Sequence, residues 1–166
     1  MKIFFVGFMG CGKTTWGRKL ASRLEYEFID LDKAFEEKVG MSITEYFEKN
    51  GQDEFRLQES KLLKETAYPE NVVVSTGGGL PVFFDNMEWM NANGQTIYIK
   101  LTPATLAERL DKGKTTRPLI LGKHGAELVA FITEKLAERE GFYEKATHVV
   151  NGIEMTPDSL AELVYS

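Results

Sequence analysis

The chain has 166 residues and a formal net charge of −5 at pH 7, and 43% of its residues are hydrophobic. That length suits one domain with its own core, and the acidic balance argues against broad nonspecific binding to nucleic acid, although a local basic patch stays possible. The sequence has no apolar run of transmembrane length, and because a strand is predicted from residue 2 we expect no signal peptide. The single cysteine, Cys11, rules out an internal disulfide and favours a cytoplasmic protein.

The first predicted elements surround a glycine-rich loop. An apolar run from Lys2 to Val6 predicts a buried strand, and apolar residues at helical spacing from Thr15 to Leu24 predict an amphipathic helix. Residues 7–14 between them fit G-x-x-x-x-G-K-[ST], a phosphate-binding loop in which Lys13 can reach the β/γ-phosphates and Thr14 can offer a hydroxyl to Mg²⁺. The alternative is an ordinary glycine-rich turn, and the order of strand, loop and helix argues against it.

Residues 26–32 predict a second strand that ends in two acids, Asp30 and Asp32. Side chains alternate along a strand, so we expect these two acids to share a face. Beside a triphosphate they can hold Mg²⁺ through water or take a proton from an attacking hydroxyl. The alternative is a solvated strand end, or a helix cap provided by Asp32. The residues leave both interpretations open for Asp32 and favour the solvated strand end for Asp30.

Helices are then predicted at 33–39, at about 43–49 after a capping-box pattern at Ser42, and from Asp53 as a cap to about Thr66. A β-branched run over 71–76 predicts a buried strand, and the glycines that follow it let backbone amides touch a small ligand, or simply form a flexible turn. The remaining predicted elements are a helix at 83–93, a strand at 95–101, a helix opened by Thr102 and Pro103, a mobile loop at 112–125, a helix at 126–140, a strand at 147–150 and a helix capped at Thr156.

Strands and helices alternate throughout, which predicts a single α/β domain over 1–166 with a parallel sheet and helices on both faces. Ligands of such sheets bind beyond the carboxyl ends of the strands. The phosphate-binding loop, the acids and the glycine run all fall at that edge. We therefore expect the active site there.

Anionic substrates and transferring phosphoryl groups favour arginine, whose planar guanidinium binds carboxylate or phosphate through two parallel hydrogen bonds. Arg56, Arg117 and Arg139 stand out, although the sequence by itself does not select these three among the other basic residues. For any one arginine, a surface residue that makes weak ion pairs is the safer interpretation.

Taken together, the motifs resemble the shikimate kinase family, a member of the small P-loop kinases that include adenylate and gluconate kinases. The matching segments run nearly end to end: residues 7–14, 30–32, 54–56 with Glu59, 75–79, 116–119 and 136–143. The resemblance implies a P-loop kinase fold with a central parallel five-stranded sheet, substrate-binding helices at about 33–61 and a lid at about 112–124. It also implies transfer of the γ-phosphoryl of ATP to the 3-hydroxyl of shikimate, with Mg²⁺ as cofactor. Apart from these small molecules we expect no nucleic-acid or membrane partner, and a monomeric chain.

The resemblance assigns roles residue by residue. Lys13, Asp32 and Arg117 are the implied catalytic residues, and Thr14 and Asp32 the implied Mg²⁺ ligands. The implied ATP contacts are Gly10, Cys11, Gly12, Lys13, Thr14, Thr15, Arg109 against the adenine, and Arg117 from the lid. The implied shikimate contacts are Asp32, Arg56, Gly77, Gly78, Gly79 and Arg139, with both arginines on the carboxylate.

The loop after the last strand departs from the family pattern. Many members carry an arginine there against the adenine, but residues 151–155 contain none, so we expect adenine to rest on backbone and apolar contacts and leave the preference for ATP over GTP open. Three rival functions are a gluconate-type sugar kinase, a nucleotide-binding module without turnover, and a nucleic-acid motor. The paired arginines, the acids of the second strand and the glycine run argue against the sugar kinase. The presence of Lys13, Asp32 and Arg117 argues against a module without turnover. The small size of the chain and its lack of a basic track argue against the motor.

Overall fold

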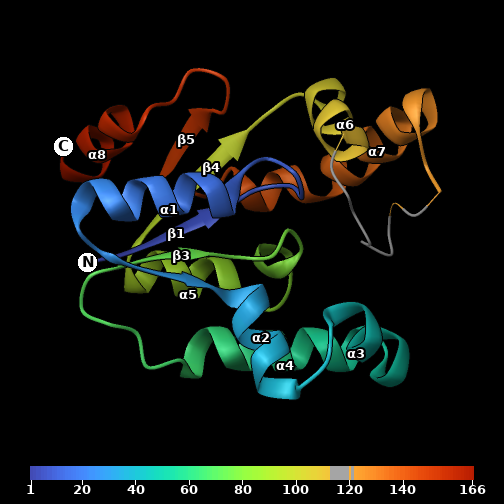
Figure 1. Cartoon of the computed structure of the whole chain (residues 1–166), viewed down its shortest axis with the longest axis horizontal. Coiled ribbons are helices and arrows are strands. Elements are labelled where there is room, and N and C mark those ends of the chain that lie inside the picture. Colours follow the sequence, from blue (N-terminus) through green and yellow to red (C-terminus); the bar gives the residue numbers. More distant parts are fainter. Residues whose placement is uncertain (113–119, 121) are drawn as a thin grey trace.

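The computed structural model describes residues 1–112, 120 and 122–166. The strands within this part of the chain form one parallel sheet in the order β2-β3-β1-β4-β5 (Figure 1). Their bounds are β1 (Lys2–Val6), β2 (Glu27–Asp30), β3 (Val72–Ser75), β4 (Gln95–Lys100) and β5 (His148–Asn151). The predicted parallel five-stranded sheet is confirmed.

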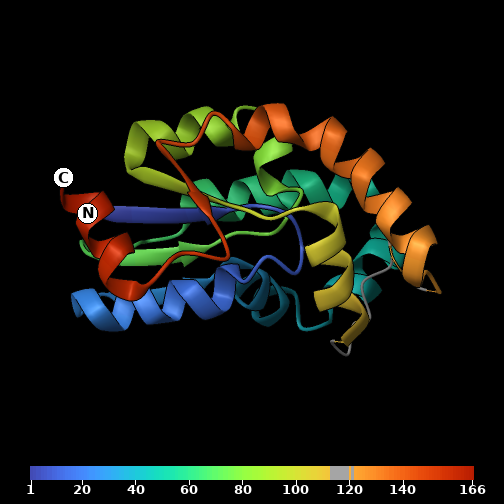
Figure 2. The ribbon, with the colours of Figure 1, turned by 90° about the horizontal axis from the view of Figure 1, so that it is seen from above.

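Helices cover both faces of the sheet, as Figure 2 shows from above. On one face lie α1 (Lys13–Leu24) and α8 (Pro157–Tyr165). On the other lie α4 (Gln52–Glu65), α5 (Asn86–Asn93) and the later turns of α7 (Gly125–Tyr143). The hydrophobic core has two parts, one on each face of the sheet, and the central strand β1 contributes side chains to both. Ile3 and Phe5 pack on one face and Phe4 and Val6 on the other, and all four are fully buried. A continuous apolar run of this kind is typical of a parallel strand that is covered on both faces.

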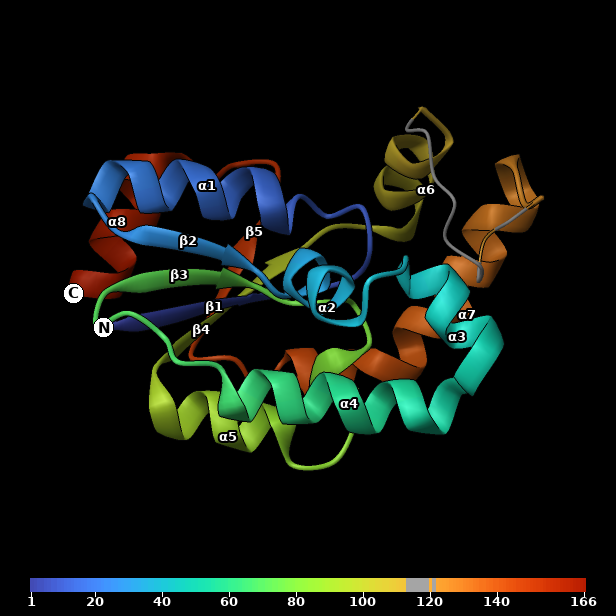
Figure 3. The same ribbon diagram turned by 60° about the horizontal axis from the view of Figure 1, so that its bottom comes forward.

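The carboxyl ends of the strands are surrounded by the remaining elements (Figure 3). These are α2 (Leu31–Val39), α3 (Ile43–Asn50), the 3₁₀ turn η1 (Leu80–Val82) and α6 (Pro103–Lys112). Both chain termini lie at the opposite end of the sheet. The elements that carry the predicted site residues therefore converge at one edge.

The second strand is shorter than predicted, and a helix begins directly at its end. β2 stops at Asp30, whose backbone is still extended and whose carboxylate accepts hydrogen bonds from the backbone N–H groups of Asp32 (3.0 Å) and Lys33 (3.3 Å). Asp30 is thus the N-cap of α2, and Asp32 lies in its first turn. The expectation that the two acids share a strand face is wrong, because capping by Asp30 starts the helix at once. The alternative in which Asp32 provides the cap is excluded for the same reason.

Other boundaries also differ. Asp53 does not cap α4, because the helix already begins at Gln52 after Gly51, whose φ of 84° favours glycine. The helix predicted from 83 begins only at Asn86, after the 3₁₀ turn and Phe84, which has a φ of 52°. Most of the predicted mobile loop at 112–125 lies outside the described residues.

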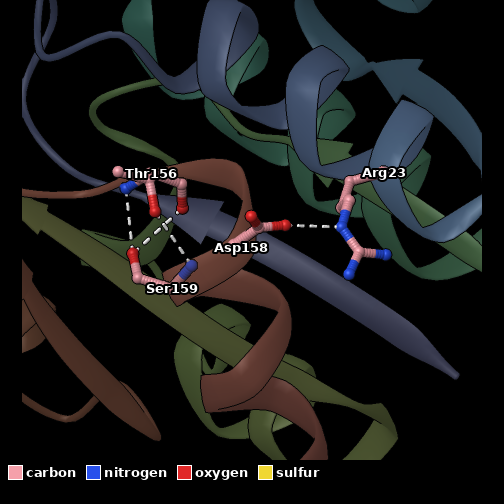
Figure 4. Close-up of polar contacts among 4 residues, drawn as sticks. All are labelled: Arg23, Thr156, Asp158 and Ser159. Carbon is pink, nitrogen blue, oxygen red and sulfur yellow. Dashed lines mark hydrogen bonds and ion pairs between the residues drawn. The ribbon is translucent and has the colours of Figure 1, made fainter.

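The last helix begins as predicted, at a cap that Figure 4 shows in detail. The Thr156 hydroxyl accepts from Ser159 N at 3.0 Å, and the Ser159 hydroxyl accepts from Thr156 N at 2.9 Å, which together form a capping box. Next to it, Arg23 Nε donates to Asp158 Oδ1 at 2.7 Å and ties α8 to the end of α1. None of the helices in the described ranges has both the length and the apolar character needed to cross a membrane.

Candidate active site at the carboxyl edge of the sheet

Two neighbouring cavities lie at the carboxyl edge of the sheet. The first has a volume of about 220 Å³ and the second about 190 Å³. They share part of their walls, formed by Met9, Asp32, Gly77 and Gly78. Of the predicted site residues, the first cavity is lined by Gly10, Gly12, Lys13, Thr14, Thr15, Asp32, Gly77 and Gly78, and the second by Asp32, Arg56, Gly77, Gly78, Gly79 and Arg139.

The first cavity is built around the glycine-rich loop between β1 and α1. Gly10 and Gly12 have φ angles of 83° and 101°, which let the chain fold closely around a ligand at the start of the helix. Lys13 Nζ donates to the carbonyl oxygens of Gly7 (2.7 Å) and Phe8 (3.1 Å), so its positive charge sits inside the loop. A loop of this shape at a helix N-terminus fits the phosphates of a nucleotide.

Oxygen atoms that suit Mg²⁺ also line this cavity, from Thr14, Asp30 and Ser75. The Thr14 hydroxyl donates to Asp30 Oδ2 at 3.3 Å and lies 3.3 Å from the Ser75 hydroxyl. Hydroxyl and carboxylate oxygens are ligands that Mg²⁺ accepts, usually together with water. From the sequence, both Asp30 and Asp32 could hold Mg²⁺, although the family resemblance assigned only Asp32, and Ser75 was not expected to contribute. The proximity of Asp30 and Ser75 follows from the pairing of β2 with β3, in which these two residues are partners.

Two further predicted nucleotide contacts lie beside the first cavity. Arg109, on α6, donates from its guanidinium to the Cys11 carbonyl oxygen at 3.4 Å. Cys11 itself is buried, and its N–H closes a turn by donating to Phe8 O at 3.2 Å. Arg109 is therefore held against the loop, whereas Arg117 lies outside the described residues.

Two arginines from distant helices meet at the second cavity. Arg56 on α4 and Arg139 on α7 both line it and are only 8% and 6% exposed. Arg56 lies over the rings of Phe55 (5.1 Å) and Phe83 (4.5 Å). Its Nε is buried and has no hydrogen-bond partner among the described residues. A buried guanidinium with a remaining donor is suited to a planar carboxylate.

Glu59 adjusts the charge of this pair and was not given a role from the sequence. Its carboxylate accepts from Arg56 at 2.9 Å, one turn along α4. Burial raises the pKa of the Glu59 carboxyl to about 7, although the positive charge of Arg56 opposes that shift. Near neutral pH, Glu59 therefore offsets only part of the positive charge of Arg56. The signal available in the sequence was the spacing of three residues between Arg56 and Glu59, which brings two side chains together on a helix.

The glycine run is needed for close approach of side chains. A Cβ on Gly77 would lie 2.9 Å from Asp32 Oδ1, and a Cβ on Gly79 would lie 2.5 Å from Arg56 Nη2. Gly79 has a φ of −91°, so its backbone alone does not require glycine. At both positions the side chain of another residue occupies the place of the missing Cβ.

The two cavities differ in what they can hold. The first offers a lysine and helix N–H groups, which suit a polyphosphate. The second offers two buried arginines for a carboxylate and, in Asp32, an acceptor for hydroxyl groups. Because Asp32 belongs to the shared wall, a hydroxyl bound there would face the end of the polyphosphate. This arrangement suits phosphoryl transfer to the alcohol of a small carboxylic acid.

Comparison with known proteins gives a consistent result. The family model described as shikimate kinase matches residues 9–165. The shikimate kinase of Parabacteroides distasonis is 45% identical over 95% of this chain and 91% of its own length.

Solved structures of shikimate kinases have the same fold. The enzyme from Bacteroides thetaiotaomicron superposes with a TM-score of 0.93, at 40% identity over 100% of this chain and 99% of the other. The enzyme from Acinetobacter baumannii in complex with shikimate has a TM-score of 0.84, at 32% identity over 99% and 90% of the two chains.

Proposed function

The chain belongs to the shikimate kinase family, and from this premise we propose how its residues divide the work of the reaction. The enzyme transfers the γ-phosphoryl group of ATP to the 3-hydroxyl of shikimate, giving shikimate 3-phosphate and ADP. The main support for this assignment of roles is that the two cavities share a wall, which includes Asp32. The first cavity takes the phosphates of ATP, and the second takes shikimate.

On the nucleotide side, Lys13 and the N–H groups of the loop neutralise the β- and γ-phosphate oxygens. Thr14 holds Mg²⁺ with help from the acids of the β2 end, and the position of Asp30 at 3.3 Å from the Thr14 hydroxyl supports including Asp30 with Asp32. When bound, Mg²⁺ supplies positive charge to the phosphate oxygens. Arg109 lies against the adenine, and Arg117 completes the site from the lid.

On the acceptor side, Arg56 and Arg139 bind the carboxylate of shikimate, and the glycine run with Asp32 receives its hydroxyl groups. Asp32 orients the 3-hydroxyl or accepts its proton, because both roles need an acceptor in the shared wall. Burial of both arginines strengthens each charged hydrogen bond by excluding water. The reaction is thus controlled by positioning and charge, as expected for phosphoryl transfer.

The assignment of chain segments to parts of the enzyme is also a proposal. Residues 1–166 form one kinase domain, the segment at about 33–61 forms its substrate-binding part, and residues at about 112–124 form its lid. A cytoplasmic location and a monomeric state are likewise predictions, the first supported by the single cysteine.

Production of ADP from ATP and Mg²⁺ tests the proposed function. The expected result is that shikimate stimulates it strongly while gluconate leaves it at the background rate. Stimulation by gluconate would overturn the roles of Arg56 and Arg139 and keep the phosphate site. ATP binding without stimulation by either compound would favour the nucleotide-binding module.

Replacing Gly79 with alanine tests the shape of the shikimate cavity. The new Cβ would lie 2.5 Å from Arg56 Nη2, so the guanidinium must move away from the carboxylate that it binds. We expect KM for shikimate to rise about 10-fold, the loss of roughly one charged hydrogen bond, and KM for ATP to stay the same. Steady-state kinetics with each substrate varied in turn measures both constants.

Gly141 supplies the matched control. A Cβ there meets nothing within 4 Å, so alanine at 141 should leave both KM values unchanged and stabilise α7 slightly. If the alanine variants at 79 and 141 have equal KM values for shikimate, Gly79 is not needed for the position of Arg56.

A further inference from the structure

A buried tyrosine lies directly behind the shikimate cavity. Tyr143, in the last turn of α7, is fully buried, and its hydroxyl donates to the carbonyl oxygen of Gly78. Arg139 lies one turn earlier on the same helix. Burial raises the pKa of the Tyr143 phenol, and the nearby positive charge of Arg139 opposes that shift. The Tyr143 hydroxyl thus joins the glycine run to the helix that carries Arg139.

The peptide that Tyr143 holds has little room to move. A Cβ on Gly78 would lie 3.2 Å from Met9 N and 3.6 Å from both Arg139 Nη1 and Gly7 O, so this glycine is enclosed between the phosphate-binding loop and Arg139. A trans peptide directs its C=O and the following N–H to opposite sides. The Gly78 carbonyl is fixed on the side of Tyr143, so the N–H of Gly79 points away from Tyr143. Gly79 lines the cavity and Tyr143 does not.

Tyr98 provides an internal comparison. It is 1% exposed, and its ring packs against that of Tyr143 with centroids 5.1 Å apart. Burial raises the pKa of both phenols, so both are neutral donors at physiological pH. The Tyr98 hydroxyl, however, donates to Glu140 at 2.6 Å, and Glu140 pairs with Lys100 at 3.1 Å, away from the shikimate cavity. The two tyrosines pack against each other in the same core, but the Tyr143 hydroxyl is bonded to the glycine run of the cavity and the Tyr98 hydroxyl to Glu140.

We propose that Tyr143 is a positioning residue for shikimate, whose hydroxyl holds the Gly78–Gly79 peptide in a fixed position relative to the helix that carries Arg139. The inference rests on the proposed binding of shikimate in this cavity. In this proposal, Tyr143 sets the distance between Arg139, which binds the carboxylate, and the backbone of the glycine run, which binds the ring hydroxyls. Tyr143 is not among the residues that line either cavity, so it acts only through the glycine run and α7.

The test compares Tyr143→Phe with Tyr98→Phe. Each change removes one buried hydroxyl and keeps the ring. For Tyr143→Phe we expect KM for shikimate to rise about 5-fold with KM for ATP unchanged, as for the loss of one hydrogen bond between neutral groups. For Tyr98→Phe we expect a similar loss in the midpoint of thermal unfolding and an unchanged KM for shikimate.

The outcomes separate the inference from the proposed function. If the unaltered enzyme phosphorylates shikimate but Tyr143→Phe leaves its KM unchanged, or if both variants raise KM equally, the inference is overturned and the function stands. If the unaltered enzyme does not respond to shikimate, the function itself fails.

A second measurement does not depend on the stability of Tyr143→Phe. The chain is labelled with 3-fluorotyrosine, and its ¹⁹F spectrum is followed as shikimate is added. We expect the resonance of position 143 to shift with shikimate and to stay in place with ADP alone, while that of position 98 responds to neither. An unmoved resonance at 143, or equal shifts at 98 and 143, would contradict the proposal.

Discussion

Replacing Lys13 with alanine is expected to lower kcat by at least about 1,000-fold while the protein stays folded. The Lys13 ammonium lies inside the phosphate-binding loop, held by the carbonyl oxygens of Gly7 and Phe8, and is the lysine of the first cavity. Its charge is placed to offset the charge that develops between the β- and γ-phosphates, and a loss of 1,000-fold corresponds to about 4 kcal/mol of transition-state stabilisation. Single-turnover assays at saturating ATP and shikimate measure the chemical step directly.

Lys19 is the matched control on the same helix. Its Nζ lies 4.4 Å from the centroid of the Trp16 ring, and it is exposed and does not line the site. Alanine at 19 should leave kcat within about twofold of the unaltered enzyme, as expected for a surface change. Near-normal turnover by a folded Lys13→Ala variant would contradict the assignment of the phosphate-binding loop.

Replacing Arg139 with alanine is expected to raise KM for shikimate by about 50-fold and to leave KM for ATP unchanged. Arg139 is 6% exposed in the second cavity, and its proposed partner is the carboxylate of shikimate. Arg56 shares that carboxylate but is partly offset by Glu59, so Arg139 should carry more of the binding energy. A charged hydrogen bond in a buried site contributes about 1.5–3 kcal/mol, which is roughly 10- to 150-fold in affinity.

Arg23 tests whether loss of an arginine by itself has such an effect. It lies at the end of α1 and pairs with Asp158, on an exposed part of the surface (Figure 4). Arg23→Ala should leave both KM values unchanged. Equal losses of shikimate and ATP binding in Arg139→Ala, or no loss of either, would remove Arg139 from the proposed shikimate site.

The parts of the fold that could be predicted from the sequence are those set by local patterns. The apolar run at 2–6, the β-branched run at 71–76 and the glycine-rich loop between strand and helix each carry their own signal, and the alternation of strands and helices implies a parallel sheet. The order of the strands and both layers of helices are consistent with those signals.

The details of the candidate site depend on which of two local structures a residue adopts and on how deeply its side chain is buried. Local sequence patterns show neither. Asp30 can continue a strand or cap a helix, and only the structure shows that capping prevails. The raised pKa of Glu59 reflects how α4 is covered by its neighbours, which no stretch of its own sequence states. The link from Tyr143 to Gly78 joins residues 65 positions apart and requires the packing of α7 against the glycine run.

The location of the two chain ends makes this enzyme convenient to attach to a support. Both termini lie at the end of the sheet away from the two cavities, so a tether there would leave the entry of ATP and shikimate open (Figures 1 and 3). The Met1 amine donates to Glu70 O and to Asn71 Oδ1, each at 2.7 Å, whereas the final residue, Ser166, is exposed. An affinity tag or a sensor surface is therefore best joined at the carboxyl end, where it replaces no contact of the amino terminus.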